Sequence, residues 1–386
     1  MDKLNSSGSQ NSPAVRWPDF EHTGPGTIAG QYMRSFWQPV HLSASLERGR
    51  AKPLNVMSQQ FTLYRTERGR AQVVADRCLH RGTALWTGTV EGEALQCFYH
   101  GWQYDVQGKC IARPAETTCP AHLHIRSYPT QEWAGFIFAF LGEGEPPPFP
   151  MLDVFNGSGA LVANAPIRPF NYFSQIENGM DEVHFNFVHR ISRFTEQGMN
   201  SEIPKLSCEE TAYGLARIST RAGVKRLNHF LMPNANIAIL FGAWHLVWRV
   251  PIDDHSHISF TVDYFDGSQD EVRNWRIQQE ALVARIAAAA PAAEVAAAVL
   301  RGEIQLKDAL DHPDLLSVQD GVALAGQGVI ANRKNELLGH SDMQIIRMRR
   351  LWAQDLTHIQ EGRASRRWVW PRHLEMTTGL KKDEVT

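Results

Sequence analysis

The sequence has little net charge and no long hydrophobic run. Its 39 basic and 41 acidic residues leave a formal net charge of −2, which gives no electrostatic reason to expect nucleic acid or an anionic membrane as a partner. No apolar stretch approaches the roughly 20 residues that a helix needs to cross a bilayer. Arg347, Arg349 and Arg350 form one basic cluster, but they alternate with apolar residues, which predicts the solvated face of an amphipathic helix.

Cysteine is also scarce, and targeting and nucleotide-binding motifs are missing. Five cysteines are too few for a disulfide framework in 386 residues, so we expect a reducing, cytoplasmic setting. Residues 1–13 are rich in Ser, Asn and Gly and lack the apolar core of a signal peptide. No GxGxxG follows a predicted strand, so we do not expect the chain to bind a nicotinamide or flavin nucleotide itself.

The first third of the chain has the pattern of a compact all-β unit. Short runs of β-branched and aromatic residues alternate with turn residues. The predicted strands cover residues 56–64, 71–76, 94–105 and 135–140. The Gly- and Pro-rich stretch at 142–148 would break any strand, so we place a domain boundary there.

The rest of the chain predicts an α+β domain in which helices grip an antiparallel sheet. Residues 171–190 have a helical pattern, and several strand-like runs and then further helices follow them. The predicted strands are 213–220, 228–232, 237–241, 244–250 and 257–264, and the predicted later helices are 272–290, 292–300, 318–332 and 343–354.

Two short ligand patterns lie within the β-rich unit. One residue separates Cys78 from His80, and sixteen residues later Cys97 and His100 are separated by two. Each pair combines a thiol with an imidazole, which suits a Rieske [2Fe–2S] cluster, where one iron takes both thiolates and the other takes both imidazoles. A zinc ion would accept the same donors and stays an alternative at this point.

These residues resemble the signature of the Rieske non-haem iron oxygenases, and His100-Gly101-Trp102 continues the likeness. The chain is most similar to the branch that contains phthalate dioxygenases and aromatic O-demethylases, through the stretches 24–27, 36–40 and 140–148. We therefore expect a disordered tail at 1–20, a Rieske [2Fe–2S] domain at 21–145, a helix-grip-like catalytic iron domain at 146–375, and a flexible tail at 376–386.

A second ligand pattern lies in the predicted helix at 171–190. His184 and His189 are five residues apart, so on a regular helix their side chains would point roughly 140° apart. If both bind one metal, the helix must carry a π-bulge or a break between them. A carboxylate would complete the facial triad of a non-haem iron(II) oxygenase. Taken alone, the two histidines could equally be buried core residues.

The resemblance supplies the carboxylate. Asp181, His184 and His189 match the family's D-x-x-H-x4-H motif, and the third family ligand is an Asp on a C-terminal helix, for which Asp320 is the best match. The rival carboxylates are Asp311, Asp314 and Asp342. Family members usually carry an acidic residue just before this Asp, and Gln319 departs from that pattern.

The resemblance also implies partners. Family subunits form head-to-tail homotrimers, in which Asp181 would bridge His100 of a neighbouring subunit and His184 of its own subunit. Asn178 would lie near the iron as a supporting group. Electrons would come from a separate NAD(P)H-dependent reductase, with or without a ferredoxin.

The metal ligands do not show whether the reaction is a monooxygenation or a ring dihydroxylation, because both reaction classes use them. The branch likeness favours monooxygenation, such as O-demethylation, of a polar aromatic compound by O2, and ring cis-dihydroxylation of an aromatic acid is the alternative. Two more remote alternative functions are a Rieske electron carrier and a zinc-bound structural protein. The predicted pocket residues are Phe173, Phe187, Phe230, Asn234, Phe241, Trp244 and Trp248. Cations for an acidic substrate are available at Arg217, Arg221, Lys225 and Arg226, unless these form a solvated strand edge.

Overall fold

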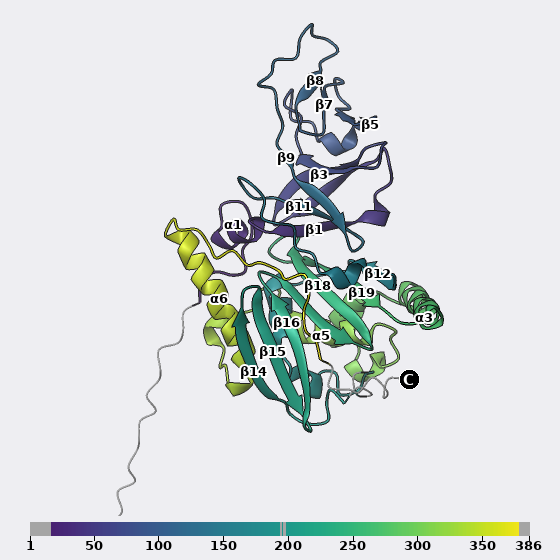
Figure 1. Ribbon diagram of the computed structural model, residues 1–386, viewed down its shortest axis with the longest axis vertical. Helices are drawn as coiled ribbons and strands as arrows, with labels where there is room; N and C mark the ends of the chain where they lie inside the picture. Colours follow the sequence, from purple (N-terminus) through teal and green to yellow (C-terminus); the bar gives the residue numbers. More distant parts are fainter. Residues whose placement is uncertain (1–16, 194, 196–197, 378–386) are drawn as a thin grey trace, which may run out of the picture.

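The computed structural model describes residues 17–193, 195 and 198–377. In this part of the chain, a small β-rich unit stands at one end and a large sheet covered by helices stands at the other (Figure 1). The short helix α1 (Ile28–Arg34) and the strands β1 and β11 lie on the side of the β-rich unit that faces the large sheet.

The β-rich unit consists of three small antiparallel sheets, with the strand orders β1-β11-β10, β2-β3-β4-β9 and β5-β6-β7-β8. Their strands are β1 (Trp37–Leu42), β2 (Ala51–Val56), β3 (Gln59–Arg65), β4 (Ala71–Ala75), β5 (Thr89–Glu91), β6 (Ala94–Gln96), β7 (Gln103–Tyr104), β8 (Cys110–Ala112), β9 (Ser127–Tyr128), β10 (Thr130–Trp133) and β11 (Phe136–Phe140). The sheet formed by β5 to β8 lies toward the end of the molecule that is far from the large sheet (Figure 1).

Residues 94–105, predicted as one strand, instead form β6 and β7 with a loop between them. The apolar run continues through this loop, where Phe98 is 76% exposed and Tyr99 is 52% exposed. Gly101 turns the chain with a φ of +70°, which glycine adopts without strain. A Cβ at this glycine would also lie 3.1 Å from Cγ of Pro114. The single-strand prediction was wrong because the pattern of apolar residues does not show that they face solvent.

Eight antiparallel strands build the large sheet, in the order β12-β19-β18-β17-β16-β15-β14, with β13 paired to β19. Their bounds are β12 (Ala160–Asn164), β13 (Ile167–Arg168), β14 (Lys205–Thr211), β15 (Gly214–Arg221), β16 (Val224–Leu231), β17 (Ala235–Leu240), β18 (Ala243–Pro251) and β19 (His257–Phe265). The five strands predicted between residues 213 and 264 are present as β15 to β19, whereas β12, β13 and β14 were not predicted. Alternate side chains of β17, β18 and β19 therefore share one face of the sheet.

The described part of the chain has five further α-helices: α2 (Tyr172–Met180), α3 (Gln269–Ala288), α4 (Ala292–Leu300), α5 (Leu315–Ala325) and α6 (Met343–Gln360). Figure 1 shows α3, α5 and α6 beside the large sheet. Helix α2 packs on β17 and β18, α3 packs on β12, α4 packs on α5, and α6 packs on β14 and β15. The helices predicted at 272–290, 292–300 and 343–354 correspond to α3, α4 and α6, and the helix predicted at 318–332 ends earlier, as α5.

Helix α2 is much shorter than the predicted helix at 171–190. It ends at Met180, because Asp181 has extended backbone angles and its carboxylate accepts hydrogen bonds from the backbone N–H groups of Val183 and His184. A short 3₁₀ turn, His184–Asn186, follows. The helix therefore breaks before His184. There is no bulge between two helical segments in this described stretch.

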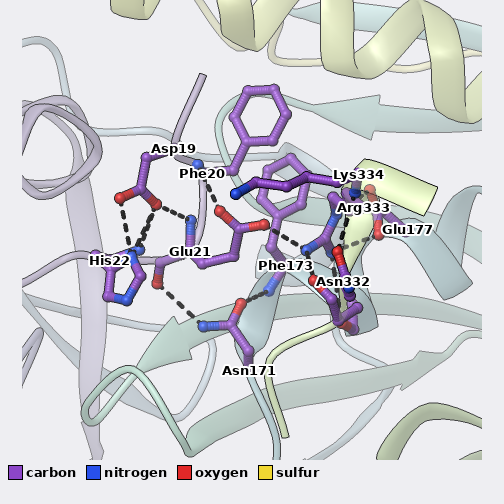
Figure 2. A network of polar contacts seen from close by, with 12 residues as sticks. Asp19, Phe20, Glu21, His22, Asn171, Phe173, Glu177, Asn332, Arg333 and Lys334 are labelled. Atoms are coloured by element: carbon purple, nitrogen blue, oxygen red, sulfur yellow. Dashed lines mark hydrogen bonds and ion pairs between the residues drawn. The ribbon is translucent and has the colours of Figure 1, made fainter. Parts of the chain in front are cut away.

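The segment at residues 17–22 packs on α2, although residues 17–20 were assigned to a disordered tail. Phe20 is fully buried and stacks on Phe173, with ring centroids 4.5 Å apart. Figure 2 shows Glu21 reaching Arg333, which also binds Glu177 of α2, with a nitrogen–oxygen distance of 2.6 Å in each ion pair. The tail prediction was wrong for residues 17–20, and residues 1–16 lie outside the described part of the chain.

Two other surface predictions also differ from the structure. Arg349, assigned to a solvated helix face, is 2% exposed and forms ion pairs with Glu177 and Glu336. Thr377, assigned to a flexible C-terminal tail, forms a β-bridge with Leu227. Residues 378–386, the rest of that predicted tail, lie outside the described residues.

Within the described ranges, no single helix is long and apolar enough to cross a membrane. The helices α3 and α4 meet the requirements of length and composition only together, and they are bent by 49° where they meet.

Candidate metal centres and substrate cavity

The four predicted cluster residues lie on two neighbouring loops. Cys78 and His80 follow β4, and Cys97 and His100 lie between β6 and β7. Both thiols are 3% exposed, whereas both imidazoles are exposed, with their ring centroids 4.5 Å apart. Trp102 stacks on the ring of His80 at 4.9 Å. The loops therefore place a pair of thiols on the inside and a pair of imidazoles on the outside.

The surroundings of the thiols suit a metal cluster. The hydroxyl of Tyr104 lies 3.2 Å from Sγ of Cys78 and accepts a hydrogen bond from the backbone N–H of Leu79. Burial raises the pKa of the Cys97 thiol, and the nearby Cys78 raises it further. A bound metal would hold both sulfurs as thiolates despite this burial.

The spacing of the four donors favours a cluster over a single ion. Among the described residues, three metal-binding side chains with all ligand atoms within 4.8 Å of one another occur at His184, His189 and Asp320, and not at the four cluster residues. The two thiols and two imidazoles are thus spread more widely than the donors of one zinc ion. They fit a [2Fe–2S] group, in which each iron takes one pair of like donors.

The second predicted ligand set does converge. Ligand atoms of His184, His189 and Asp320 all lie within 4.8 Å of one another. His184 begins the 3₁₀ turn after α2, His189 follows in a loop, and Asp320 lies on α5. Nε2 of His189 is 3.2 Å from Oδ1 of Asp320. Two imidazoles and one carboxylate at this spacing fit a mononuclear non-haem iron with open positions.

Both imidazoles are held through Nδ1. Nδ1 of His184 donates to the backbone carbonyl of Asp181 at 2.6 Å, and Nδ1 of His189 donates to Oε1 of Gln319 at 2.8 Å. These bonds fix the tautomers and leave both Nε2 atoms for a metal. The role of Gln319 was not predicted; the sequence showed only that it departs from the family's usual acidic residue.

His189 and Asp320 each shift the pKa of the other toward its charged form. Burial acts to lower the pKa of His189, but its hydrogen bond to Asp320 and the negative charge of that carboxylate outweigh burial and raise the pKa above its usual value. Burial acts to raise the pKa of Asp320, but the hydrogen bond and charge of His189 outweigh it and lower the pKa. Burial lowers the pKa of His184. Asp320 is therefore ionised and available as an anionic ligand.

Asn178 and Asp181 lie beside this group. Nδ2 of Asn178 donates to Oδ1 of Asp320 at 3.4 Å, and Gln175 donates to the amide oxygen of Asn178. The carboxylate of Asp181 accepts from the backbone N–H of His184 at 3.2 Å. The end of α2 thus connects to both the carboxylate and one imidazole of the site.

A buried ion cluster supports the same segment and was not recognised in the sequence. Glu182 is 3% exposed and binds Arg217 and Arg221. Burial acts to raise the pKa of Glu182, but the charges of the two arginines outweigh it and lower the pKa. Arg217 and Arg221, considered as substrate-binding cations, instead neutralise this carboxylate. Arg226 is also buried, so the alternative of a solvated strand edge was wrong for all three arginines.

A cavity of about 1100 Å³ opens onto the His184, His189 and Asp320 group. Its floor is the face of the large sheet that carries alternate residues of β18 and β19 and part of β17, and residues of α3 and α5 also line it. The arginines of its lining include Arg168 and Arg249, and a hydrogen-bonded pair of His245 and Asp263 lies on the floor.

The prediction of pocket residues was mostly wrong. Of the seven, Phe241 lines the large cavity, and Trp244 lines a separate, smaller pocket. Phe173, Phe230, Asn234 and Trp248 are buried in the core, and Phe187 is 63% exposed and outside the lining. The reason is strand alternation: Val247 and Arg249 face the cavity, so Trp248 between them faces the core. Polarity and aromatic character alone do not reveal this choice of face.

Comparison with known proteins identifies the N-terminal unit. Residues 36–129 match the family model of the Rieske [2Fe–2S] domain. The oxygenase subunit of 5,5'-dehydrodivanillate O-demethylase from Sphingobium sp. (strain NBRC 103272 / SYK-6) is 29% identical over 92% of this chain and 82% of that protein. The oxygenase subunit of phthalate 4,5-dioxygenase from Pseudomonas putida is 25% identical over 87% of this chain and 84% of that protein.

Solved structures show the same architecture. The oxygenase of carbazole 1,9a-dioxygenase, in its reduced complex with ferredoxin, matches 85% of this chain and 90% of its own with a TM-score of 0.63 and 20% identity. The fold is therefore that of a Rieske terminal oxygenase, which confirms the predicted α+β class.

Domain content, fold and relatives together define the class of this protein: it is a Rieske-type oxygenase, an oxidoreductase that uses O2. Within that class it is the terminal oxygenase component, for which the [2Fe–2S] cluster and a mononuclear iron are the cofactors. The predictions of class, enzyme type and cofactors are confirmed.

Proposed function

We propose that this terminal oxygenase carries out monooxygenation, most simply O-demethylation, of a polar aromatic compound. The observation that carries the proposal is the convergence of His184, His189 and Asp320, within 4.8 Å of one another, at a cavity of about 1100 Å³. A relative similar over 92% of the chain is an O-demethylase subunit. A methyl aryl ether, O2, two electrons and two protons would give a phenol, formaldehyde and water.

The proposal assigns the ligands as follows. Cys78, His80, Cys97 and His100 hold the [2Fe–2S] cluster, and His184, His189 and Asp320 hold the mononuclear iron. When bound, the iron activates O2 with electrons that the cluster delivers. Asp181 and Gln319 keep Nδ1 of each imidazole protonated, which is supported by their short hydrogen bonds to the rings. Asn178 holds Oδ1 of Asp320 through its amide.

The proposed electron donor is a reductase, directly or through a ferredoxin. Two observations support it: no nucleotide-binding motif is visible in the sequence, and a structural relative is known in complex with ferredoxin. Around the outer imidazoles, Leu79, Phe98 and Tyr99 expose apolar surface of the kind that partner proteins cover.

We further propose a head-to-tail homotrimer, in which Asp181 links His100 of the partner subunit to His184. The exposure of both cluster imidazoles leaves them accessible to such a neighbour. The second oxygen of the Asp181 carboxylate has no hydrogen bond among the described contacts, whereas the first accepts two.

Metal analysis tests the ligand assignment. The purified protein should contain roughly three irons and two sulfides per chain and show the low average g value of a His-ligated cluster after reduction. Asp320→Ala should lose the mononuclear iron and keep the cluster signal, and Cys97→Ser should do the reverse. A wild-type protein with two irons, to which added Fe(II) restores no third, would leave an electron carrier.

Product analysis tests the reaction. Methoxylated aromatic compounds should release one formaldehyde for each O2 consumed in coupled turnover. Recovery of a cis-dihydrodiol without formaldehyde would instead establish ring dihydroxylation. The similarity to phthalate 4,5-dioxygenase supports this alternative.

A further inference from the structure

Arg249 is an unpaired cation in the wall of the substrate cavity. It lies on β18, lines the cavity and is only 8% exposed. Its Nε and Nη1 are buried and have no hydrogen-bond partner among the described residues. A guanidinium carries five N–H donors, and buried donors of this kind are nearly always paired in folded proteins. We therefore expect a ligand that enters the cavity to supply the missing hydrogen-bond acceptor for Arg249.

A second arginine strengthens the positive potential at this place. Arg168 lies on β13, which pairs with β19 on the side away from β18. It also lines the cavity, and its guanidinium donates to Oγ of Ser317 at 2.8 Å. Burial first, and then the charge of Arg168, lower the pKa of Arg249 to about 9, so Arg249 stays charged at neutral pH. The same two arginines help burial to lower the pKa of His257 to about 3. Three basic side chains thus meet in one region.

Five acids line the cavity, Glu182, Asp263, Asp311, Asp314 and Asp320, and among the described residues none of them forms an ion pair with Arg249 or Arg168. Asp320 is the one acid whose charge acts on Arg249 in the described part of the chain, and it belongs to the proposed iron site, where it would share its charge with a metal. Glu182 is neutralised by two other arginines. Asp263 pairs with His245, at the far end of the same strands. Arg249 and Arg168 are therefore left without a carboxylate of their own.

The floor beside Arg249 suits an aromatic ring. Arg249, Val247 and His245 alternate along β18 on the cavity face, so Arg249 and His245 are about 13 Å apart at roughly 3.3 Å per residue. Val247 provides apolar surface between them, and Ala238 on β17 lies opposite His245. Opposite Arg249, Ser259 on β19 also lines the cavity with its hydroxyl. A cationic end at Arg249, an apolar stretch at Val247 and a hydrogen-bonding far end at His245 therefore follow one another along β18.

We propose that Arg249, with Arg168 beside it, binds the carboxylate of an aromatic acid substrate. The proposal rests on the function proposed above, since it takes this cavity as the substrate site, and it narrows the polar aromatic compound to an acid. Guanidinium and carboxylate match in geometry, and their charge-assisted hydrogen bonds are stronger than neutral ones. The anion would satisfy the unpaired N–H groups of Arg249 and hold the ring over Val247.

The test compares an acid with its neutral amide on the holoenzyme. The dissociation constants of 3-methoxybenzoate and 3-methoxybenzamide are measured by calorimetry for the wild type, Arg249→Gln and Arg249→Lys. The wild type should prefer the benzoate, and Arg249→Gln should weaken benzoate binding by about 10- to 100-fold while leaving benzamide binding nearly unchanged. Arg249→Lys, which keeps the charge but not the planar fork, should lie between them.

Arg276→Gln provides the matched control, because Arg276 is exposed on α3 and outside the cavity lining. It should bind the benzoate as the wild type does. Iron content and the cluster spectrum of each variant show that it is folded and loaded. Equal binding of acid and amide by the wild type, or an unchanged benzoate affinity in a loaded Arg249→Gln protein, would overturn the proposal.

Failure of the proposed function would look different. In one outcome, the protein binds the benzoate through Arg249 but consumes no O2 with any methoxylated or phenoxylated aromatic compound. This result would support the anion site and contradict the proposed monooxygenation. A protein that demethylates only neutral aromatic ethers would keep the proposed function and overturn the anion site.

Discussion

At the scale of single residues, the iron site depends on what each histidine binds through Nδ1. His184 uses a backbone carbonyl, whose position follows from the break after α2, whereas His189 uses the side chain of Gln319. A neutral amide oxygen accepts a hydrogen bond from Nδ1–H but is too weak a base to remove the proton. Gln319 should therefore fix the ring without adding negative charge next to Asp320.

Gln319→Ala is expected to weaken binding of Fe(II) at the mononuclear site by about 10- to 100-fold, because His189 loses the hydrogen bond that orients its ring. The measurement is an Fe(II) titration of protein stripped of mononuclear iron, with the cluster absorption as an internal standard. Gln327→Ala, just after α5 and exposed, is the control and should bind Fe(II) normally. Unchanged affinity in Gln319→Ala would show that the amide does not orient the ligand.

His257 predicts a pH dependence of stability. Burial, assisted by the charges of Arg249 and Arg168, lowers its pKa in the folded protein to about 3. In the unfolded chain its pKa is about 6.5, so between these values the unfolded state binds a proton that the folded state does not. The free energy of unfolding therefore falls as the pH decreases through this window, by about 2 kcal/mol at pH 5 from this group alone.

Urea unfolding at pH 7.5 and pH 5 measures this effect. His257→Gln keeps a donor for the backbone carbonyl of Phe170 but cannot take up a proton, so it should lose less stability between the two pH values than the wild type. His255→Gln, which changes an exposed histidine, should behave like the wild type. Equal losses for His257→Gln and the wild type would rule out this histidine as the source.

At the scale of elements, the position of Asp320 depends on how closely α5 packs on α4. Gly321 follows Asp320 on α5, and a Cβ at this glycine would lie 2.9 Å from Cβ of Ala296 on α4, closer than side chains pack. The absence of a side chain at Gly321 therefore sets the distance between the two helices. It also sets how far Asp320 reaches toward the histidines.

Gly321→Val should push α5 away from α4, destabilise the protein by about 1–3 kcal/mol through overpacking, and lower the occupancy of the mononuclear iron. The cluster should be unaffected, because it lies in the other unit (Figure 1). Iron and sulfide counts, with thermal unfolding, measure both effects. Gly339→Ala is the control, because its added Cβ would lie no closer than 3.8 Å to a neighbouring atom, and it should keep the stability and iron content of the wild type. Full iron occupancy in Gly321→Val would refute the argument.

At the scale of the whole molecule, the two proposed centres lie in different units of one chain. The cluster loops are toward one end and α5 is in the other unit (Figure 1). A head-to-tail ring would bring the cluster of one subunit to the iron of the next, and such heterologous contacts close into rings. The exposed imidazoles and the exposed Phe98 then become interface residues.

Mixed oligomers test this arrangement. Cys97→Ser and Asp320→Ala are each expected to be inactive, but their co-expressed mixture should regain about a quarter of wild-type activity, because one interface in four joins an intact cluster to an intact iron site. Turnover per total chain is the measurement. A mixture of Asp320→Ala with His184→Ala, which both lack the iron site, is the control. An inactive first mixture with normal assembly would place electron transfer within one chain.

Local patterns carried much of the prediction. The spacing of Cys78, His80, Cys97 and His100 is local, because each pair lies on one loop, and a loop keeps its donors together whatever the rest of the fold does. The motif from Asp181 to His189 is local in the same way. Strands β15 to β19 were also predictable, since hairpin neighbours follow one another in the chain and show their pattern directly.

The tertiary structure decided what depends on distant contacts. The face of β18 that points away from the cavity packs on β10 and β11, where Trp248 contacts the rings of Trp133, Phe136 and Phe138, so Trp248 became core and Arg249 became cavity wall. The pairing of Glu182 with Arg217 joins residues 35 positions apart, and the burial of Phe20 joins the N-terminal segment to α2. The sequence by itself determined the donors and the class of chemistry, because ligand identity is a local property. Burial and charge pairing arise only when remote segments meet, so only the folded chain shows which cation is left unpaired for a substrate.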